Sequence, residues 1–298
     1  MRKLFSILPL TVIFFFSSCQ KDIVVPQPPY DSRVSIQGLI EPDSIPVIYF
    51  NKTVPYFSNS TNTADLVIRY ATIKITSSSG TDVLTLDSIL NRVNCKYIYF
   101  YKGAVPIQWN TTYVLSINSG TETYTATTST ALTPVSIDSV SYTSTFKDIY
   151  GEHEGVIVYF KDTPSQTNYY HYEMLRPVDA NTKYREVPLV SPCLGTDTII
   201  VTELGRSVYN DQNVDGQQIK IVVEPAYSHR QGLICYVRMQ TIDKAVYDFY
   251  DQLDKQKLSQ LNPFVEPVFL KDGQFGKRAV GFFGCKTLSA KAKFIFPE

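Results

Sequence analysis

Short stretches in which apolar and polar residues alternate are the dominant feature of this sequence. Val34-Ser35-Ile36-Gln37-Gly38-Leu39-Ile40 alternates with a period of two, which is the pattern of a β-strand with two different faces. Similar runs follow, separated by turn residues such as Ser79-Gly80 and Asn118-Ser119-Gly120. This succession of short strands predicts an immunoglobulin-like β-sandwich for residues 32–130.

A second β-rich region follows a short linker. Residues 127–136 are small and polar with one proline, as linkers between domains are. We expect a second domain at residues 131–298, with one amphipathic helix at about 242–261, capped by Thr241 and ended by Pro263. The apolar stripe of this helix consists of Ile242, Val246, Phe249 and Leu253. The predicted fold class is therefore mostly β, with an N-terminal sandwich and a second β-rich domain that carries the helix.

The first residues have the features of an export signal. Arg2 and Lys3 precede the apolar run Leu4–Phe16, which is shorter than the ~20 residues that span a bilayer. The run ends at Ser17-Ser18-Cys19, which resembles a bacterial lipobox. We predict a lipoprotein signal peptide at residues 1–18 and a covalent lipid on Cys19. The alternative is an ordinary signal peptide with an incidental cysteine.

Gln20, Lys21 and Asp22 directly follow the predicted lipid site. A lysine beside an acidic residue at this place resembles the signal that sends Bacteroidota lipoproteins to the outer face of the outer membrane. Residues 19–31 also contain three prolines, which predict a stiff, extended tether. We therefore expect a lipid-anchored protein of the outer membrane that faces the cell exterior.

Charge and motif content exclude several classes of protein. Lysine plus arginine number 28, and aspartate plus glutamate number 28, so the formal net charge is zero. A neutral chain lacks the electrostatic footprint of a nucleic-acid-binding protein, and we exclude that class. The chain has only three histidines and contains no Gly-x-Ser-x-Gly, His-Glu-x-x-His or phosphate-binding glycine loop. We predict a protein that is not an enzyme and has no catalytic residues.

Four cysteines lie beyond the predicted lipid site, and three pairings of them are available. They are Cys95, Cys193, Cys235 and Cys285. Three of the four lie in the predicted second domain, so a bridge within that domain is the expected arrangement if the compartment is oxidising. None has a cysteine or histidine close by in sequence, which argues against a zinc site.

One segment resembles the first half of a calcium-binding loop. Asp211-x-Asn213-x-Asp215-Gly216 has the alternating oxygen ligands of such a loop. However, Val222 stands at the twelfth position, where a bidentate acid is expected. The alternative is a hairpin turn in which Gly216 supplies a positive φ angle. Asp211, Asn213 and Asp215 are thus a weak candidate for calcium, and no other metal or cofactor is expected.

Aromatic residues gather between Asn91 and Asn110. An exposed aromatic group of this kind binds sugars or partner proteins. The alternative is an aromatic strand whose alternate side chains fill a core. The candidate contact residues for a partner or a glycan are Tyr97, Tyr99, Tyr101 and Trp109.

Several pieces of the chain, in this order, resemble the Bacteroidota outer-membrane lipoprotein family catalogued as domain of unknown function 4249. The resemblance covers about Val34 to Gly284. It implies a lipoprotein of the outer membrane, often paired with a TonB-dependent transporter, and it carries over no catalytic residue. The pieces are Val34–Ile40, Val54-Pro55-Tyr56-Phe57, Thr121–Thr128, Asn210-Asp211 with Asp215-Gly216, Gln240–Tyr250, Asn262-Pro263-Phe264 and Gly281-Phe282-Phe283-Gly284.

These observations lead to one main functional hypothesis and two rivals. The main hypothesis is a non-enzymatic surface lipoprotein that assists a TonB-dependent transporter, or another outer-membrane barrel, by binding cargo or the partner protein. The cargo would be a peptide or a glycan. The first rival is a free-standing adhesin or glycan-binding lipoprotein, which the tyrosine content favours. The second rival is a hydrolase, which the scattered histidines disfavour.

Overall fold

The computed structural model describes residues 30, 32–55, 62–148, 151–178, 193, 195, 197–225, 229, 231–261, 268 and 270–297. The predicted signal peptide, Cys19 and the export residues Gln20, Lys21 and Asp22 lie outside these residues. Ser32–Glu298 forms one compact unit.

The prediction of a mostly β chain is confirmed. The described residues form two helices, α2 (Thr63–Leu66) and α3 (Lys244–Leu261). The strands are β1 (Val34–Ile40), β2 (Val47–Lys52), β3 (Thr72–Ser77), β4 (Gly80–Asn91), β5 (Lys96–Lys102), β6 (Thr112–Ser119), β7 (Glu122–Ser129), β8 (Ile137–Asp148), β9 (Gly151–Lys161), β10 (Tyr169–Val178), β11 (Ile199–Asn210), β12 (Gln218–Val223), β13 (Ile234–Ile242), β14 (Ala279–Leu288) and β15 (Ala292–Ile295).

Most strands belong to one large mixed sheet. Its order is β11-β10-β13-β14-β1-β2-β5-β4-β3-β6-β7, and β15 pairs with β13 outside this path. A second sheet has three strands, in the order β12-β9-β8. The large sheet thus contains strands from both of the regions that the sequence analysis treats as separate domains.

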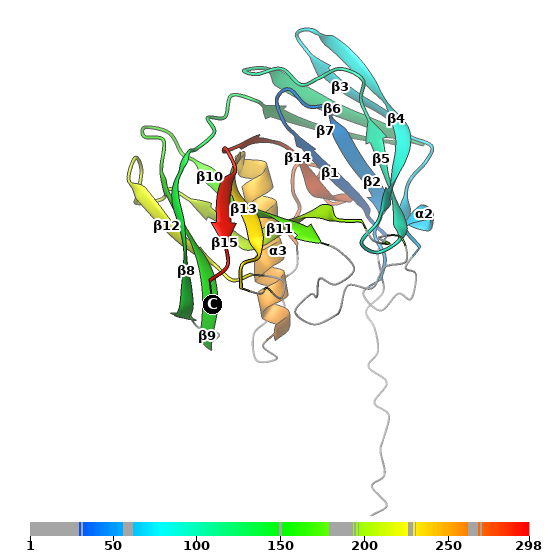
Figure 1. The fold of residues 1–298 in the computed structure, drawn as a ribbon. Helices are drawn as coiled ribbons and strands as arrows, with labels where there is room; N and C mark the ends of the chain where they lie inside the picture. Colours follow the sequence, from blue (N-terminus) through cyan, green and yellow to red (C-terminus); the bar gives the residue numbers. More distant parts are fainter. Residues whose placement is uncertain are drawn as a thin grey trace, which may run out of the picture. The chain divides into compact units, whose positions relative to one another are not determined.

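The two regions are joined by a parallel pair of strands. β14 lies beside β1, with Ile36 opposite Gly281 and Ile40 opposite Cys285. Figure 1 shows the two strands side by side, β1 in blue and β14 near the red end of the scale. The sequence gives no sign of this pairing, because β-strand periodicity does not say which strands pair. β1 and β2 therefore share a sheet with the last part of the chain.

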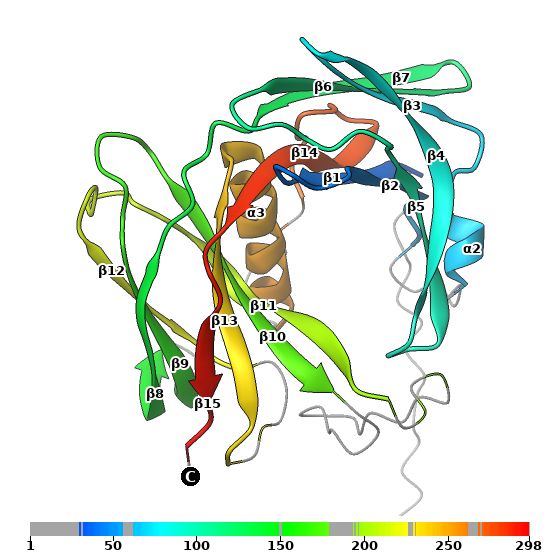
Figure 2. The same ribbon diagram turned by 45° about the horizontal axis from the view of Figure 1, so that its top comes forward.

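The two largest apolar clusters of the described residues form most of the interior. The first lies where the large sheet turns back on itself, and it includes Ile36, Phe50, Ile73, Leu115 and Phe283, all fully buried. The second lies between the large sheet and the three-stranded sheet, with β10 and β13 on one side and β9 and β12 on the other. Figure 2 shows the strands that enclose the two clusters.

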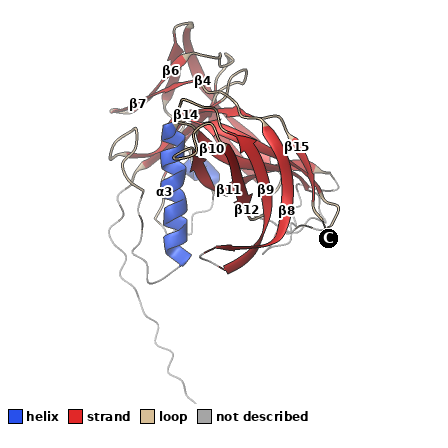
Figure 3. Cartoon of the chain, turned by 90° about the vertical axis from the view of Figure 1, so that its left-hand side faces the viewer, coloured by secondary structure: helices blue, strands red, loops and turns tan. Residues whose placement is uncertain are grey.

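α3 confirms the predicted helix, with a start two residues later than expected. Asp243, and not Thr241, caps it, because the Asp243 Oδ1 atom accepts a hydrogen bond of 3.0 Å from the Val246 amide. Val246 is fully buried in a cluster with Phe282 and Ile242, and the helix packs mainly on β14 and β11. Figure 3 shows α3 in blue along the strands. Neither helix in the described residues is long and apolar enough to cross a membrane.

Candidate functional site

The outer parts of β4 and β5 form a two-stranded arm with exposed apolar side chains. We call residues 86–99 the β4–β5 arm. β2 pairs with β5 only at Lys102 and Tyr101, so within the sheet the arm consists of the pairing between β4 and β5. α2 lies beside β5, and the Thr63 hydroxyl donates a hydrogen bond to the Tyr97 carbonyl. Figure 2 shows the two strands extending away from β1 and β2.

Apolar side chains occupy both faces of the β4–β5 arm. Ile89 is 60% exposed and pairs with Ile98 on one face, while Tyr97 is 53% exposed and pairs with Leu90 on the other. An isolated exposed apolar residue is ordinary, but several on one projecting hairpin mark a contact surface for another molecule.

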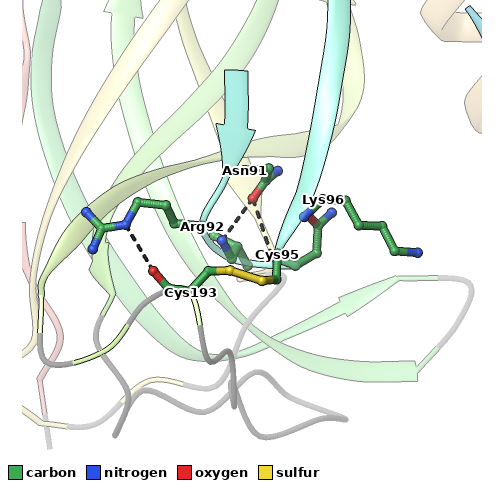
Figure 4. The surroundings of a disulfide bond; sticks show 7 residues. Asn91, Arg92, Cys95, Lys96 and Cys193 are labelled. Carbon is green, nitrogen blue, oxygen red and sulfur yellow. Dashed lines mark hydrogen bonds between the residues drawn. A yellow bond between two sulfur atoms is a disulfide. The ribbon is translucent and has the colours of Figure 1, made fainter. Parts of the chain in front are cut away.

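A disulfide bond between Cys95 and Cys193 holds the tip of this arm. The two residues are 98 positions apart, and their Cα atoms lie 5.4 Å from each other. The Arg92 Nε atom donates a hydrogen bond of 3.2 Å to the Cys193 carbonyl (Figure 4). The Arg92 guanidinium also pairs with Asp197. This bridge corrects the expectation of a disulfide within residues 131–298, because it connects the first β-region with the second.

A small apolar cluster supports the same junction. Val93, in the turn of the arm, packs with Val178, Ile199 and Val201 at the ends of β10 and β11. The tip of the β4–β5 arm is therefore fixed by a covalent bond, an ion pair and apolar contacts.

The other two cysteines, Cys235 and Cys285, keep their thiols and are fully buried. Burial raises the pKa of the Cys285 thiol to about 12, with Asp243 and Glu41 adding to the shift. The thiolate is the reactive form, so the folded protein keeps this thiol unreactive at pH 8.

We predict that iodoacetamide at pH 8 leaves Cys235 and Cys285 unmodified in the folded protein and alkylates both after unfolding in urea. Peptide mass spectrometry under non-reducing conditions measures each site separately. Rapid alkylation of Cys285 in the folded chain would contradict its burial.

The predicted aromatic contact residues do not form one surface. Tyr97 is exposed and Tyr99 is half-buried, with the Arg69 guanidinium 4.9 Å from the centre of its ring. Tyr101 is 2% exposed and donates a hydrogen bond of 2.7 Å to the Ile68 carbonyl, so it belongs to the core. Trp109 is 44% exposed but lies beyond the other end of β5, where its Nε1 atom donates to Asp43.

The calcium candidates lie in the turn between β11 and β12. Carboxylate oxygens of Asp211, Asp215 and a third residue, Asp162, lie within 4.8 Å of one another. We call these three residues the aspartate cluster. Asp162 directly follows β9, and the sequence analysis missed it because it lies 49 residues before Asp211. Asn213 has a positive φ of 70° and an exposed side chain, and it is not part of the cluster.

Backbone amides and neutral side chains contact the aspartate cluster. Asp162 accepts hydrogen bonds from Tyr170 and from the Gly216 amide, the latter at 2.8 Å. Asp211 accepts one from the Asn168 amide, and Asp215 one from the Ser165 amide, both at 2.9 Å. Burial and the hydrogen bond to Asp162 raise the pKa of Tyr170. These bonds fasten the loop after β9 to the turn before β12. Gly216 has a positive φ of 69°, as the turn alternative predicts, but β11 and β12 belong to different sheets, so the segment is not a β-hairpin.

Two histidines lie beside carboxylates on the three-stranded sheet. The His229 Nε2 atom is 2.8 Å from the Glu154 Oε2 atom, and the His153 Nδ1 atom is 3.6 Å from Glu224. Tyr142 also donates to Glu154, and burial with this bond raises the pKa of Tyr142 to about 12. The His229 ring stacks on Phe296, with the ring centres 4.0 Å apart. These contacts hold the segment around Phe296 against the three-stranded sheet.

A pocket of about 420 Å³ lies between α3, residues 270–274 and β14. The sequence analysis did not indicate it, because its walls come from three separate segments. The residues that line it are Lys244, Ala245, Asp248, Phe249, Gln252, Leu270, Lys271, Asp272, Gly273, Gln274, Val280 and Gly281.

Residues 21–288 match the model of a protein family described as a domain of unknown function, DUF4249. The chain belongs to this family. No protein among those with curated descriptions matches it. The matched region of the DUF4249 chain includes the β4–β5 arm, both cysteines of the disulfide, the aspartate cluster and the pocket.

The Gly-x-Phe-Gly segment that resembles this family has a clear steric role in the DUF4249 chain. A Cβ atom on Gly281 would overlap the carbonyl oxygen of Ile36 on β1. A Cβ atom on Gly284 would overlap Val246 and lie 2.7 Å from Asp243, at the start of α3. These two glycines therefore allow β14 to lie close to β1 on one side and to α3 on the other.

Proposed function

We propose that this DUF4249 chain is a non-enzymatic lipoprotein of the outer membrane, anchored by lipid on Cys19 and facing the cell exterior. It assists a TonB-dependent transporter, or another outer-membrane barrel, by binding cargo or the barrel itself. The lipobox-like Ser17-Ser18-Cys19 segment and Lys21-Asp22 support the anchor and its direction. The structural observation that carries the proposal is the exposed apolar β4–β5 arm.

The β4–β5 arm suits a stable protein contact for two reasons. First, its apolar residues occupy both faces of a narrow hairpin, so a partner can bury Ile89 and Tyr97 at once. Second, the disulfide at its tip holds it in place before binding, which reduces the conformational entropy lost on association. Buried aromatic and aliphatic anchors of this kind contribute most of the affinity of protein interfaces.

The test is co-purification from native outer membranes through a C-terminal tag. We expect the wild-type chain to recover a stoichiometric TonB-dependent barrel. Ile89→Asp and Tyr97→Asp each place a charge in the predicted interface, and we expect each to lower the recovered barrel about tenfold or more.

Val114→Asp is the matched control for these variants. Val114 is 40% exposed on β6, away from the arm, so its replacement adds the same charge without touching the predicted interface. Recovery of the lipoprotein alone, or equal losses in all three variants, would refute the proposal. Protection of the chain from protease added to intact cells would refute its exterior location.

The alternative function is a free-standing adhesin or glycan-binding surface lipoprotein. The exposed rings of Tyr97 and Trp109 favour it, because exposed aromatic rings stack on sugars. Under this alternative, Tyr97→Ala or Trp109→Ala abolishes glycan binding by the purified chain without changing its melting temperature. Unchanged binding in both variants would exclude these rings as the site.

We further propose that calcium binds weakly at the aspartate cluster. Three carboxylates within 4.8 Å repel one another, and none of the ion pairs in the described residues includes them. A divalent cation would relieve this repulsion. We predict that millimolar calcium raises the melting temperature relative to a chelator, and that Asp215→Asn removes the difference. Equal melting temperatures of the wild-type chain with calcium and with chelator would show that the cluster binds no calcium and only holds the loop after β9 to the turn before β12.

A further inference from the structure

The pocket beside α3 has a mixed lining that is suited to a small polar molecule. Its volume of about 420 Å³ lies at the lower end of the range of small-molecule sites, ~300–1,000 Å³. Phe249, Leu270 and Val280 supply apolar surface from three different segments. Lys244 and Asp248 lie on α3, while Lys271 and Asp272 lie on the segment opposite.

Several polar groups of this pocket keep hydrogen-bonding capacity for a ligand. The Gln252 Oε1 atom accepts from the Lys271 amide at 2.7 Å, and within the described residues its Nε2 atom has no acceptor. Asp248 uses Oδ2 to pair with Lys244 at 2.6 Å, and Asp272 uses Oδ1 to pair with Arg33. The second oxygen of each carboxylate has no donor among the described residues. The pocket therefore offers both donors and acceptors.

The charge of the lining argues for a neutral ligand. Two lysines and two aspartates line the pocket, so their formal charges cancel. A phosphate or a carboxylate ligand near Asp248 and Asp272 would also lie near Lys244 and Lys271, so the lining provides no net electrostatic attraction that would offset the desolvation of its charge. A neutral molecule that carries hydroxyl groups can accept from Gln252 and donate to either carboxylate.

The strand beside the pocket argues against an extended peptide. β14 pairs with β1 through Ala279–Cys285, and with β13 only through Lys286–Leu288. On the side away from β1, the Gln274 side chain bonds both the amide and the carbonyl of Phe283, and Asp243 accepts from the Cys285 amide. These side chains occupy backbone groups that an added peptide strand would need. A ligand of this pocket must be bound mainly through side chains. A sugar ring fits this requirement, since its hydroxyl groups bind carboxylates and amides and its C–H face packs on an aromatic ring such as Phe249.

We propose that this pocket binds a neutral saccharide of one or two rings. The proposal deepens the cargo-binding part of the proposed function, and rests on it, by naming the site and the class of cargo. Asp248 and Gln252 on α3 would bind hydroxyl groups, and Phe249 would contact the sugar face. The site lies apart from the β4–β5 arm, so binding of cargo and binding of a barrel use different surfaces.

The test uses the chain purified in detergent and a fixed set of probes. The neutral probes are maltose, cellobiose and lactose, and the comparison probes are digalacturonate and trialanine. We expect saturation-transfer NMR to detect at least one neutral disaccharide, and calorimetric titration to give its affinity. Failure of all three neutral probes, or tighter binding of digalacturonate or trialanine, would overturn the proposal.

Two variants and a matched control locate the site. Ala245→Phe fills the pocket from α3, and Asp248→Ala removes a hydroxyl acceptor, so each is expected to weaken binding about tenfold or more. Asp251→Ala removes the same kind of i,i+4 pair, with Lys255 at 2.6 Å, outside the pocket. It is expected to leave the affinity unchanged.

These variants also distinguish saccharide binding in the pocket from barrel binding by the β4–β5 arm. If Ala245→Phe fails to fold, Asp248→Ala against Asp251→Ala still decides the location of the site. An equal effect of these two, or no effect of Asp248→Ala, would overturn the proposal. All three variants leave the β4–β5 arm intact, so we expect each to recover the same amount of barrel as the wild-type chain. The amount of barrel recovered therefore tests only the proposal that the arm binds a barrel.

Discussion

Replacement of both bridging cysteines, Cys95→Ser with Cys193→Ser, is expected to lower the free energy of unfolding by about 4 kcal/mol. The bond closes a loop between residues 98 positions apart, and closure of so long a loop removes much conformational entropy from the unfolded chain. The bond also holds the tip of the β4–β5 arm to the ends of β10 and β11. Urea unfolding, followed by tryptophan fluorescence and circular dichroism, measures the change.

Reductant provides the control for this prediction. It should lower the urea midpoint of the wild-type chain to that of the double variant and leave the double variant unchanged. The buried thiols of Cys235 and Cys285 are present in both proteins, so they do not contribute to the difference between the two midpoints. Equal midpoints of the oxidised wild type and the double variant would show that the bond does not constrain the chain. The double variant should also recover less barrel, because the arm loses its fixed position.

The sequence allows the β class to be predicted because strand periodicity is local. Alternation in Val34–Ile40 and the turn residues around Gly120 identify strands that the structure contains. The stripe of Val246 and Phe249 likewise identifies α3. The pairing of β14 with β1 depends on contacts between residues more than 200 positions apart, and no local pattern records it. The large mixed sheet could therefore not be predicted from the sequence.

In the candidate site, too, the sequence shows the features that depend on local spacing and does not show the contacts between distant residues. The spacing of Asp211 and Asp215 placed two members of the aspartate cluster, while Asp162 joins them only through the fold. Alternation also placed Tyr97, Tyr99 and Tyr101 on one face of β5. It could not show that Tyr101 lies opposite Ile48 of β2 and is buried, while Tyr97 lies in the part of β5 that β2 does not reach and is exposed. Burial depends on which layers cover each position of a strand.

The Cys95–Cys193 bond could not be chosen from the sequence for a related reason. Three pairings were open, and cysteine spacing carries no information on distance in space. The bridge depends on how the large sheet brings the tip of the arm to the ends of β10 and β11, where Val93 packs against Val178. The arrangement of the strands therefore decides which two cysteines lie close enough to form the bond.

Gly281→Ala is expected to lower the free energy of unfolding by about 3–5 kcal/mol or to prevent folding. Gly281 has a φ of 120°, which is unfavourable for any residue with a Cβ atom. It lies opposite Ile36 in the parallel pair of β1 and β14. The added Cβ atom would overlap the Ile36 carbonyl oxygen and lie 2.8 Å from its carbonyl carbon. The two strands must separate to admit it, and this breaks the sheet between its two halves.

Gly276→Ala separates this steric effect from backbone strain. Gly276 also has a positive φ, of 69°, but a Cβ atom there meets nothing within 4 Å. Its replacement should cost only the strain of a left-handed residue, about 1 kcal/mol. The difference between the two variants in urea midpoint measures the close approach of β14 to β1. A soluble Gly276→Ala chain beside an insoluble Gly281→Ala chain supports the same conclusion, whereas equal midpoints would mean that the two strands do not pair at this register.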